Sequence, residues 1–272
     1  MLNEIELQNY ITKIMLSDNE YTFIEDTHKY LYKGEHQVKR SVTGFVGEFF
    51  EEFDLEKTAE NYAKKHGMNV IDVLSMWQRN GEISSTAGTI IHSYMENRMR
   101  GKLLKHDFSK ARELGIYKEV FELVQKLQPQ ADAFYEDCYN KLIPLQMEFT
   151  VGLEDIIAGN IDLLCYNKYA GELQIWDYKN LKNFTDYNQY NNYAKREFAL
   201  YQDTTLTHYS MQLSFYKCVL ERKYGIKIGN CYLVHFNTNN NLPNEFKIHQ
   251  CINLSNECNQ ALDRIIKERG TK

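Results

Sequence analysis

The chain has 272 residues and a formal net charge of −5, and 43% of its residues are hydrophobic. This composition is typical of a globular protein with a sizeable core, and it excludes collagen-like and low-complexity chains. The sequence has no apolar run of about 18 residues, so we expect no membrane span. The acidic, amphipathic N-terminal segment lacks the features of a secretory signal, and the length favours a single domain.

Six cysteines stand at positions 138, 165, 218, 231, 251 and 258, and none of them forms a CxxC pair. This spacing gives little support to a zinc ribbon or an iron–sulfur cluster. Cys165 and Cys231 fall in apolar segments that we expect to be buried strands. We therefore expect a reduced protein of the cytoplasm.

Hydrophobic periodicity predicts a largely helical first half. Short alternating segments predict a β-hairpin from 21–24 and 29–32, with 38–42 as a candidate third strand. We expect helices at 4–16, from 45, and at 55–66, 69–80, 85–100 and 113–141. The Ser/Thr cluster at 84–86 suits an N-cap for the helix at 85. Pro129 is expected to kink or divide the long helix.

The second half predicts a central sheet. The expected strands lie at 145–151, 157–165 and 173–179, which form an antiparallel meander, and at 230–236 and 246–252. Residues 181–206 are polar and predict a long loop with one helical turn. Helices are expected at 207–224 and 255–268. The fold class expected is α+β, a central mixed sheet with an antiparallel meander, flanked by helices.

The stretch 159–180, GNIDLLCYNKYAGELQIWDYKN, holds the charged residues of a candidate site, Asp162, Asp177 and Lys179. Two apolar runs flank a polar loop, which predicts a hairpin with Asp162 in its first strand and Asp177 and Lys179 at the end of its second. Asp177 and Lys179 share a face because side chains two apart point the same way. Close carboxylates repel one another, and a divalent cation removes that penalty. Alone, the spacing also fits an ordinary surface ion pair.

Several segments of the chain resemble motifs of the PD-(D/E)XK nuclease superfamily. Glu148, GNID ending at Asp162 and IWDYK ending at Lys179 resemble its core. The segment 87–92, AGTIIH, and the segment 212–216, QLSFY, resemble two helix motifs of its RecB-type exonuclease branch. The chain is also similar to phage-encoded and mitochondrial genome maintenance exonucleases. The resemblance covers about residues 85–236, with an N-terminal part at 1–84 and a C-terminal strand and helix at 237–272.

The resemblance implies a metal site and catalytic roles. Asp162, Asp177, His92 and the main-chain carbonyl of Tyr178 would hold one or two Mg2+ or Mn2+ ions, which prefer oxygen ligands and accept imidazole. Lys179 would position the attacking water, and Glu148 would lie beside the metal. For His92, the alternative is an ordinary packed or surface helix residue.

The resemblance also implies contacts with DNA. Gln212 and Tyr216 are neighbours on one helix face, and they would reach phosphate or DNA, although a half-buried packing role also fits. Thr89 and Lys182 are further candidates for contact with the nucleic acid, although ordinary surface charge explains Lys182 equally well. Tyr187, Tyr190 and Tyr193 could stack on bases of a single strand.

Charge is unevenly distributed along the chain. Residues 1–60 hold six Lys or Arg against 13 Asp or Glu, whereas residues 177–227 hold eight against five. The positive bias follows the hairpin, where a phosphate-binding groove is expected, although a solvated helix face explains the same charge. The expected function is a magnesium- or manganese-dependent DNA exonuclease of DNA repair, recombination or phage DNA processing. The alternatives are a structure-specific endonuclease and a catalytically silent nucleic-acid-binding adapter, and a homo-oligomer or a recombination partner stays open.

Overall fold

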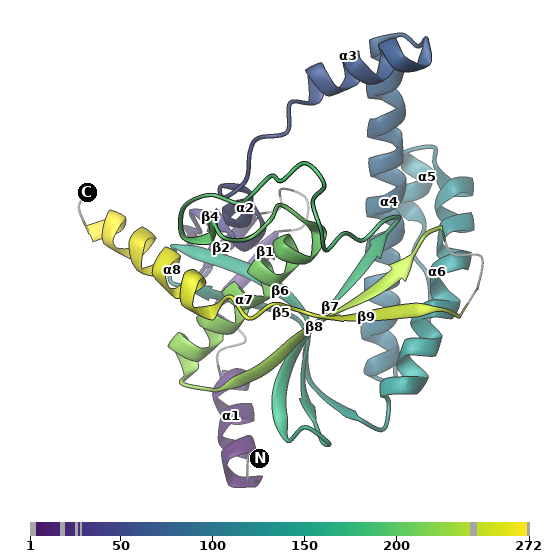
Figure 1. Ribbon diagram of the computed structural model, residues 1–272. Helices are drawn as coiled ribbons and strands as arrows, with labels where there is room; N and C mark the ends of the chain where they lie inside the picture. Colours follow the sequence, from purple (N-terminus) through teal and green to yellow (C-terminus); the bar gives the residue numbers. More distant parts are fainter. Residues whose placement is uncertain (1–3, 17–19, 25–26, 28, 240–243, 271–272) are drawn as a thin grey trace.

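The structure, a computed structural model, describes residues 4–16, 20–24, 27, 29–239 and 244–270 (Figure 1). Its fold is α+β, with a mixed central sheet flanked by helices, as the sequence predicts. The helices described are α1 (Glu4–Leu16), α2 (Val42–Gly47), α3 (Leu55–His66), α4 (Val70–Met99), α5 (Ser109–Glu113), α6 (Tyr117–Cys138), α7 (Thr205–Tyr224) and α8 (Ser255–Gly270), with the 3-10 turn η2 (Arg196–Phe198). Among the described residues, no helix combines the length and apolarity that crossing a membrane requires.

The strands form two sheets. They are β1 (Tyr21–Ile24), β2 (Lys29–Tyr32), β3 (His36–Gln37), β4 (Arg40–Ser41), β5 (Leu142–Leu153), β6 (Ile157–Asn167), β7 (Glu172–Leu181), β8 (Ile228–Asn237) and β9 (Phe246–Gln250). Strands β1 to β3 make a small antiparallel sheet, and the other six make the central sheet. The expected meander is confirmed, because β5, β6 and β7 pair antiparallel in sequence.

Strand β6 organises the central sheet. Strand β5 runs along one edge of β6 for its full length, and β7 pairs with the other edge only from Asn167 to Leu163. Farther along that edge, β4 pairs parallel with Ile157 and Ala158. Strand β7 then continues parallel to β8, which the crossover through α7 allows. Strands β6 and β7 therefore separate just beyond Leu163.

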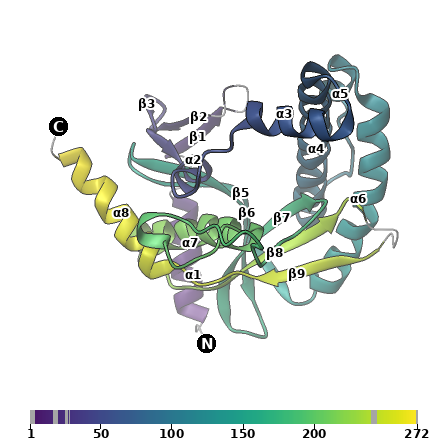
Figure 2. The ribbon, with the colours of Figure 1, turned by 45° about the horizontal axis from the view of Figure 1, so that its top comes forward.

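Helices cover both faces of this sheet. Leu164 and Ile175 pack in a cluster with α2, α7 and α8, whereas their neighbours Leu163 and Trp176 pack in a second cluster with α4 and α6. Figures 1 and 2 show these two groups of helices on opposite sides of the strands. Consecutive residues point to opposite faces of a strand, so the central strands are buried on both sides.

Helix α4 is one continuous helix of 30 residues, so the prediction of separate helices at 69–80 and 85–100 is wrong. Asn69 is its N-cap and accepts a hydrogen bond from the Ile71 amide. Thr86 lies buried inside the helix, and the Ser/Thr cluster at 84–86 caps nothing. Packing of α3 on the first half and of α6 on the second half stabilises the uninterrupted helix.

Two other expectations also need correction. Helix α6 passes through Pro129 without dividing and begins at Tyr117, after the separate α5. Buried apolar residues on both sides of Pro129, such as Val124 and Phe134, are worth about 1.5–3 kcal/mol each and offset the proline cost of about 3 kcal/mol. The expected third hairpin strand at 38–42 is misplaced, since the third strand of the small sheet is β3 at His36–Gln37 and β4 at Arg40–Ser41 belongs to the central sheet.

Candidate functional site

The separation of β6 and β7 places the two aspartates of the hairpin. The last pair of that ladder is Leu163 with Trp176, so Asp162 and Asp177 stand next on the two strands. There the amide of Tyr178 donates to Asp162 Oδ2 at 2.7 Å. The Tyr178 amide thus bonds to a side-chain carboxylate where the regular pairing would give it a main-chain carbonyl of β6. This hydrogen bond holds the Asp162 side chain at the place where β6 and β7 separate. Both aspartates are buried, at 8% and 1% exposure.

Glu148 belongs to β5, which pairs with the edge of β6 away from β7, and it stands next to Asp162. It falls between the pairs Met147 with Leu163 and Phe149 with Ile161. Its φ of 50° is left-handed, a conformation that costs a non-glycine residue of order 1–3 kcal/mol and is common at functional sites. Asn160 donates to Glu148 Oε2 at 2.5 Å, and Asn160 in turn accepts from the Thr150 hydroxyl at 3.1 Å.

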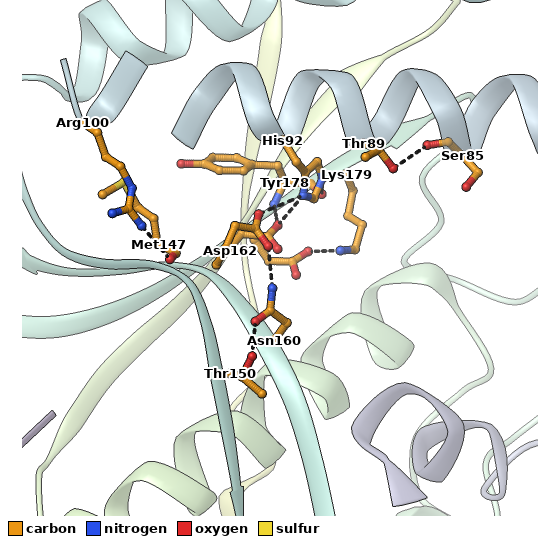
Figure 3. Close-up of polar contacts among 12 residues, drawn as sticks. Ser85, Thr89, His92, Arg100, Met147, Thr150, Asn160, Asp162, Tyr178 and Lys179 are labelled. Atoms are coloured by element: carbon orange, nitrogen blue, oxygen red, sulfur yellow. Dashed lines mark hydrogen bonds and ion pairs between the residues drawn. The ribbon is translucent and has the colours of Figure 1, made fainter. Parts of the chain in front are cut away.

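His92 reaches this group from α4. Its Nε2 lies 3.0 Å from the Tyr178 carbonyl, while its Nδ1 lies 3.5 Å from Asp162 Oδ2 and 3.7 Å from Glu148 Oε1 (Figure 3). A neutral imidazole that donates from Nε2 presents a lone pair at Nδ1. The Tyr178 carbonyl was expected as a metal ligand, and the structure gives it a partner in His92.

His92, Glu148 and Asp162 form the group that could hold a cation. Each offers one ligand atom, and these atoms lie within 4.8 Å of one another, the one such group of three or more found among the described residues. Two carboxylates and an imidazole suit Mn2+ or Mg2+. The chemistry of this donor set therefore fits the expected metal.

Asp177 lies next to this group but is not one of its three members. Its carboxylate forms an ion pair with Lys179, and the two side chains are 2% and 20% exposed. Burial and the charge of Asp162 raise the pKa of Asp177, while Lys179 opposes that change. Burial lowers the pKa of Lys179, but the charges of Asp177 and Asp162 outweigh it and keep the ammonium protonated. Lys179 also lies over the Tyr209 ring, 5.1 Å from its centroid.

The pKa of His92 reports the same negative surroundings. Burial lowers it, but the charge of Asp162 and the contact with Glu148 outweigh burial and raise it to about 9. Without a cation, the imidazole is therefore protonated at neutral pH and neutralises part of the acidic group. A bound cation takes over that role by displacing the proton.

The predicted DNA contacts divide into buried and exposed residues. Gln212 donates to the Tyr216 hydroxyl at 2.9 Å, and the two residues are 7% and 3% exposed. The Tyr216 ring lies against Gly159, where an added Cβ would sit 2.5 Å from Cε1. The Tyr216 ring is buried beneath β6 in this structure, so it is not exposed for direct contact with DNA. Thr89 and Lys182 are exposed, and the Thr89 hydroxyl donates to the Ser85 carbonyl.

An open cleft of about 550 Å³ leads to the group. Its lining includes His92 and Glu148, the α4 residues Gly88, Thr89, Ser93 and Glu96, and residues that sequence reasoning missed: Phe23, Lys110, Thr150 and Asn160. Asn160 could have been found, since it stands two residues before Asp162 in the motif GNID. Phe23 carries no such signal because the hairpin reaches the cleft only through tertiary packing.

Comparison with known proteins adds little. No protein-family model matches the sequence, and no curated protein matches it. Among solved structures, the chain is similar to one described as "Crystal structure of SSO0001", with 11% identity and a TM-score of 0.28 over 66% of this chain and 85% of that chain. A likeness of this size carries no argument about family or activity.

Proposed function

We propose that the chain is a divalent-metal-dependent DNA exonuclease of the PD-(D/E)XK superfamily. The observation that carries the proposal is the convergence of ligand atoms of His92, Glu148 and Asp162 within 4.8 Å, at a cleft that His92 and Glu148 line, with the Asp177–Lys179 pair beside them. Negative groups held this closely suit a cation and phosphate chemistry. The free state of all six thiols supports a reducing compartment, the cytoplasm.

Each side chain has a role in this proposal. Asp162, Glu148 and His92 Nδ1 would hold the cation, which supplies Lewis acidity toward a phosphoryl oxygen and lowers the pKa of bound water. Lys179, kept protonated by its acidic neighbours, donates hydrogen bonds to the attacking water or to developing phosphate charge. It therefore acts as a donor and not as the base. Asp177 holds Lys179 through their ion pair, and its carboxylate would be available as a further metal ligand if that pair opened.

A cleavage assay tests the proposal. End-labelled linear DNA is incubated with Mn2+ or Mg2+, with and without EDTA, for the wild type, Asp162→Asn and Asp137→Asn. Asp137 is the matched control, because it is an exposed α6 carboxylate paired with Lys141. We expect metal-dependent cleavage by the wild type and the control, and a loss of at least about 100-fold for Asp162→Asn. Cleavage without metal, or equal rates in all three proteins, contradicts the proposal.

Two further readouts separate the alternatives. Circular single-stranded DNA is opened by an endonuclease and is resistant to an exonuclease. Salt-dependent DNA binding without cleavage in Mn2+ identifies a nucleic-acid-binding adapter that has lost turnover.

A further inference from the structure

Lys179 makes two contacts of different kinds with residues on two different elements. Its ammonium forms an ion pair with Asp177 on the same strand, β7. It also lies over the ring of Tyr209 on α7, with Nζ 5.1 Å from the ring centroid, within the range of about 6 Å for a cation–π contact. Asp177 belongs to the same strand, so its ion pair alone does not fix the ammonium relative to other elements. Tyr209 supplies that second point of reference.

The segment that joins β7 to α7 holds Tyr209 in place (Figure 1). Thr185 lies in this segment, and its hydroxyl accepts a hydrogen bond from the Thr205 amide while its carbonyl accepts one from the Leu206 amide. Both amides belong to the first turn of α7. The start of the helix is therefore tied to the chain that leaves β7, and Tyr209 follows one turn later.

The residue before Tyr209 fixes the same turn from another side. His208 stacks on Phe50, with ring centroids 3.6 Å apart, and its Nε2 lies 2.7 Å from Asp203 Oδ1. Tyr209 is half-buried and packs against the core cluster that contains Phe50. The backbone at Tyr209 is thus held by contacts that do not involve Lys179.

An aromatic face holds an ammonium without neutralising it. A second carboxylate would cancel the charge of Lys179, whereas the face of a tyrosine ring attracts the cation through its quadrupole. A lysine ammonium has three N–H donors, and the ion pair with Asp177 does not use all of them. The donors that remain are those that the proposed function assigns to the attacking water or to developing phosphate charge.

From these contacts we infer that Tyr209 is a positioning residue, whose ring holds the Lys179 ammonium beside the His92–Glu148–Asp162 group. The role of this contact in cleavage rests on the proposed function, whereas the contact itself does not. Tyr209 lies three residues before the segment 212–216 and belongs to none of the motifs noted in the sequence. Because Tyr209 acts through Lys179, its loss should slow the chemical step and leave DNA affinity largely unchanged.

Single-turnover cleavage of end-labelled DNA in Mn2+ tests this role. We expect Tyr209→Leu to cleave about tenfold more slowly, with the DNA concentration for half-maximal rate unchanged. Tyr209→Phe keeps the ring face and should stay within about twofold of the wild type. Tyr166→Leu is the matched control, because Tyr166 is half-buried against the same core cluster but lies near the far end of β6. Equal rates for Tyr209→Leu and the wild type, or an equal loss in Tyr209→Phe or Tyr166→Leu, overturn the inference.

A double-mutant cycle measured by urea denaturation in EDTA needs no cleavage. Tyr209→Leu should raise the equilibrium constant for unfolding about fivefold more in the wild type than in Lys179→Met, since only the wild type has the contact to lose. Tyr166→Leu should have the same effect in both backgrounds. Coupling in proteins that do not cleave DNA supports the contact and contradicts the nuclease proposal. Additive effects together with cleavage by the wild type remove the role of Tyr209 and leave the nuclease proposal standing.

Discussion

The imidazole of His92 is bridged between the Tyr178 carbonyl, 3.0 Å from Nε2, and the Asp162 carboxylate, 3.5 Å from Nδ1. The backbone of β7 thereby sets which ring nitrogen faces the acidic group. A second partner of this kind fixes both the tautomer and the orientation of a metal-binding histidine. In the proposed metal site, this contact would leave Nδ1 as the ligand atom once its proton has left.

Metal affinity should therefore depend steeply on pH. The raised pKa of His92, about 9, means that the ring stays protonated until pH approaches 9, and a cation must displace that proton. Apparent Mn2+ affinity should rise by up to about tenfold per pH unit between pH 7 and 9, as one proton is released on binding. Calorimetric titrations at pH 7, 8 and 9 measure this slope.

The variant His92→Gln supplies the control for that slope. It removes the titrating group and should bind Mn2+ more weakly, with a flat dependence over the same range. An equal slope in both proteins would assign the released proton to another residue.

The left-handed backbone at Glu148 can be tested by two substitutions that remove the same carboxylate. Alanine retains the strain of a positive φ, whereas glycine relieves it. Glu148→Gly should therefore be more stable than Glu148→Ala by about 1 kcal/mol, the reverse of the usual order within a strand. Urea denaturation measures both free energies of unfolding, and Phe149→Gly against Phe149→Ala shows the normal order.

Gly159 should not tolerate a side chain. The Cβ of an alanine would lie 2.5 Å from Tyr216 Cε1, and overpacking of this kind costs about 1–3 kcal/mol. Gly47→Ala is the control, since nothing lies within 4 Å of its added Cβ. Thermal unfolding should show a loss for Gly159→Ala alone, and Tyr216→Leu in that background should recover part of it. Equal melting temperatures for the two alanine variants would contradict the close approach.

Lys179 should matter for stability as well as activity. Lys179→Met leaves the buried Asp177 carboxylate without its partner, which should lower the free energy of unfolding by about 3 kcal/mol in EDTA. Adding Asp177→Asn removes the unpaired charge and should restore most of that loss without restoring cleavage.

Lys141→Met is the matched control for this pair. Its ion pair with Asp137 is exposed, at 47% and 48%, and it should cost less than about 1 kcal/mol. A loss of similar size in the two lysine variants would mean that the Asp177–Lys179 pair is not buried in solution.

The sequence predicted most of the sheet because β-strand alternation is a local signal. The strands at 145–151, 157–165 and 173–179 match β5, β6 and β7 within a few residues. The errors lie where tertiary packing outweighs local signals. The Ser/Thr cluster at 84–86 resembles an N-cap, but α4 continues through it because the helix packs on α3 and α6. Pro129 resembles a break, but the buried face of α6 outweighs it.

The site was predictable to a lesser degree. The motifs place Asp162, Glu148 and His92 in the chain, and the structure brings the three together. Burial of Tyr216 could not be read from a helix pattern, because it depends on the absence of a side chain at Gly159. The spacing of Asp177 and Lys179 on one strand predicts that the two side chains share a face, but their burial, at 2% and 20% exposure, depends on tertiary packing that no local pattern encodes.

Strand β4 is only Arg40–Ser41, yet it joins the N-terminal segment to the backbone of Ile157 and Ala158. An expression fragment that starts at residue 85, where the recognisable motifs begin, would cut α4 in mid-helix. It would also leave an unpaired strand edge next to Gly159. Exposed edges of this kind template aggregation, so a soluble minimal fragment has to start upstream of Arg40.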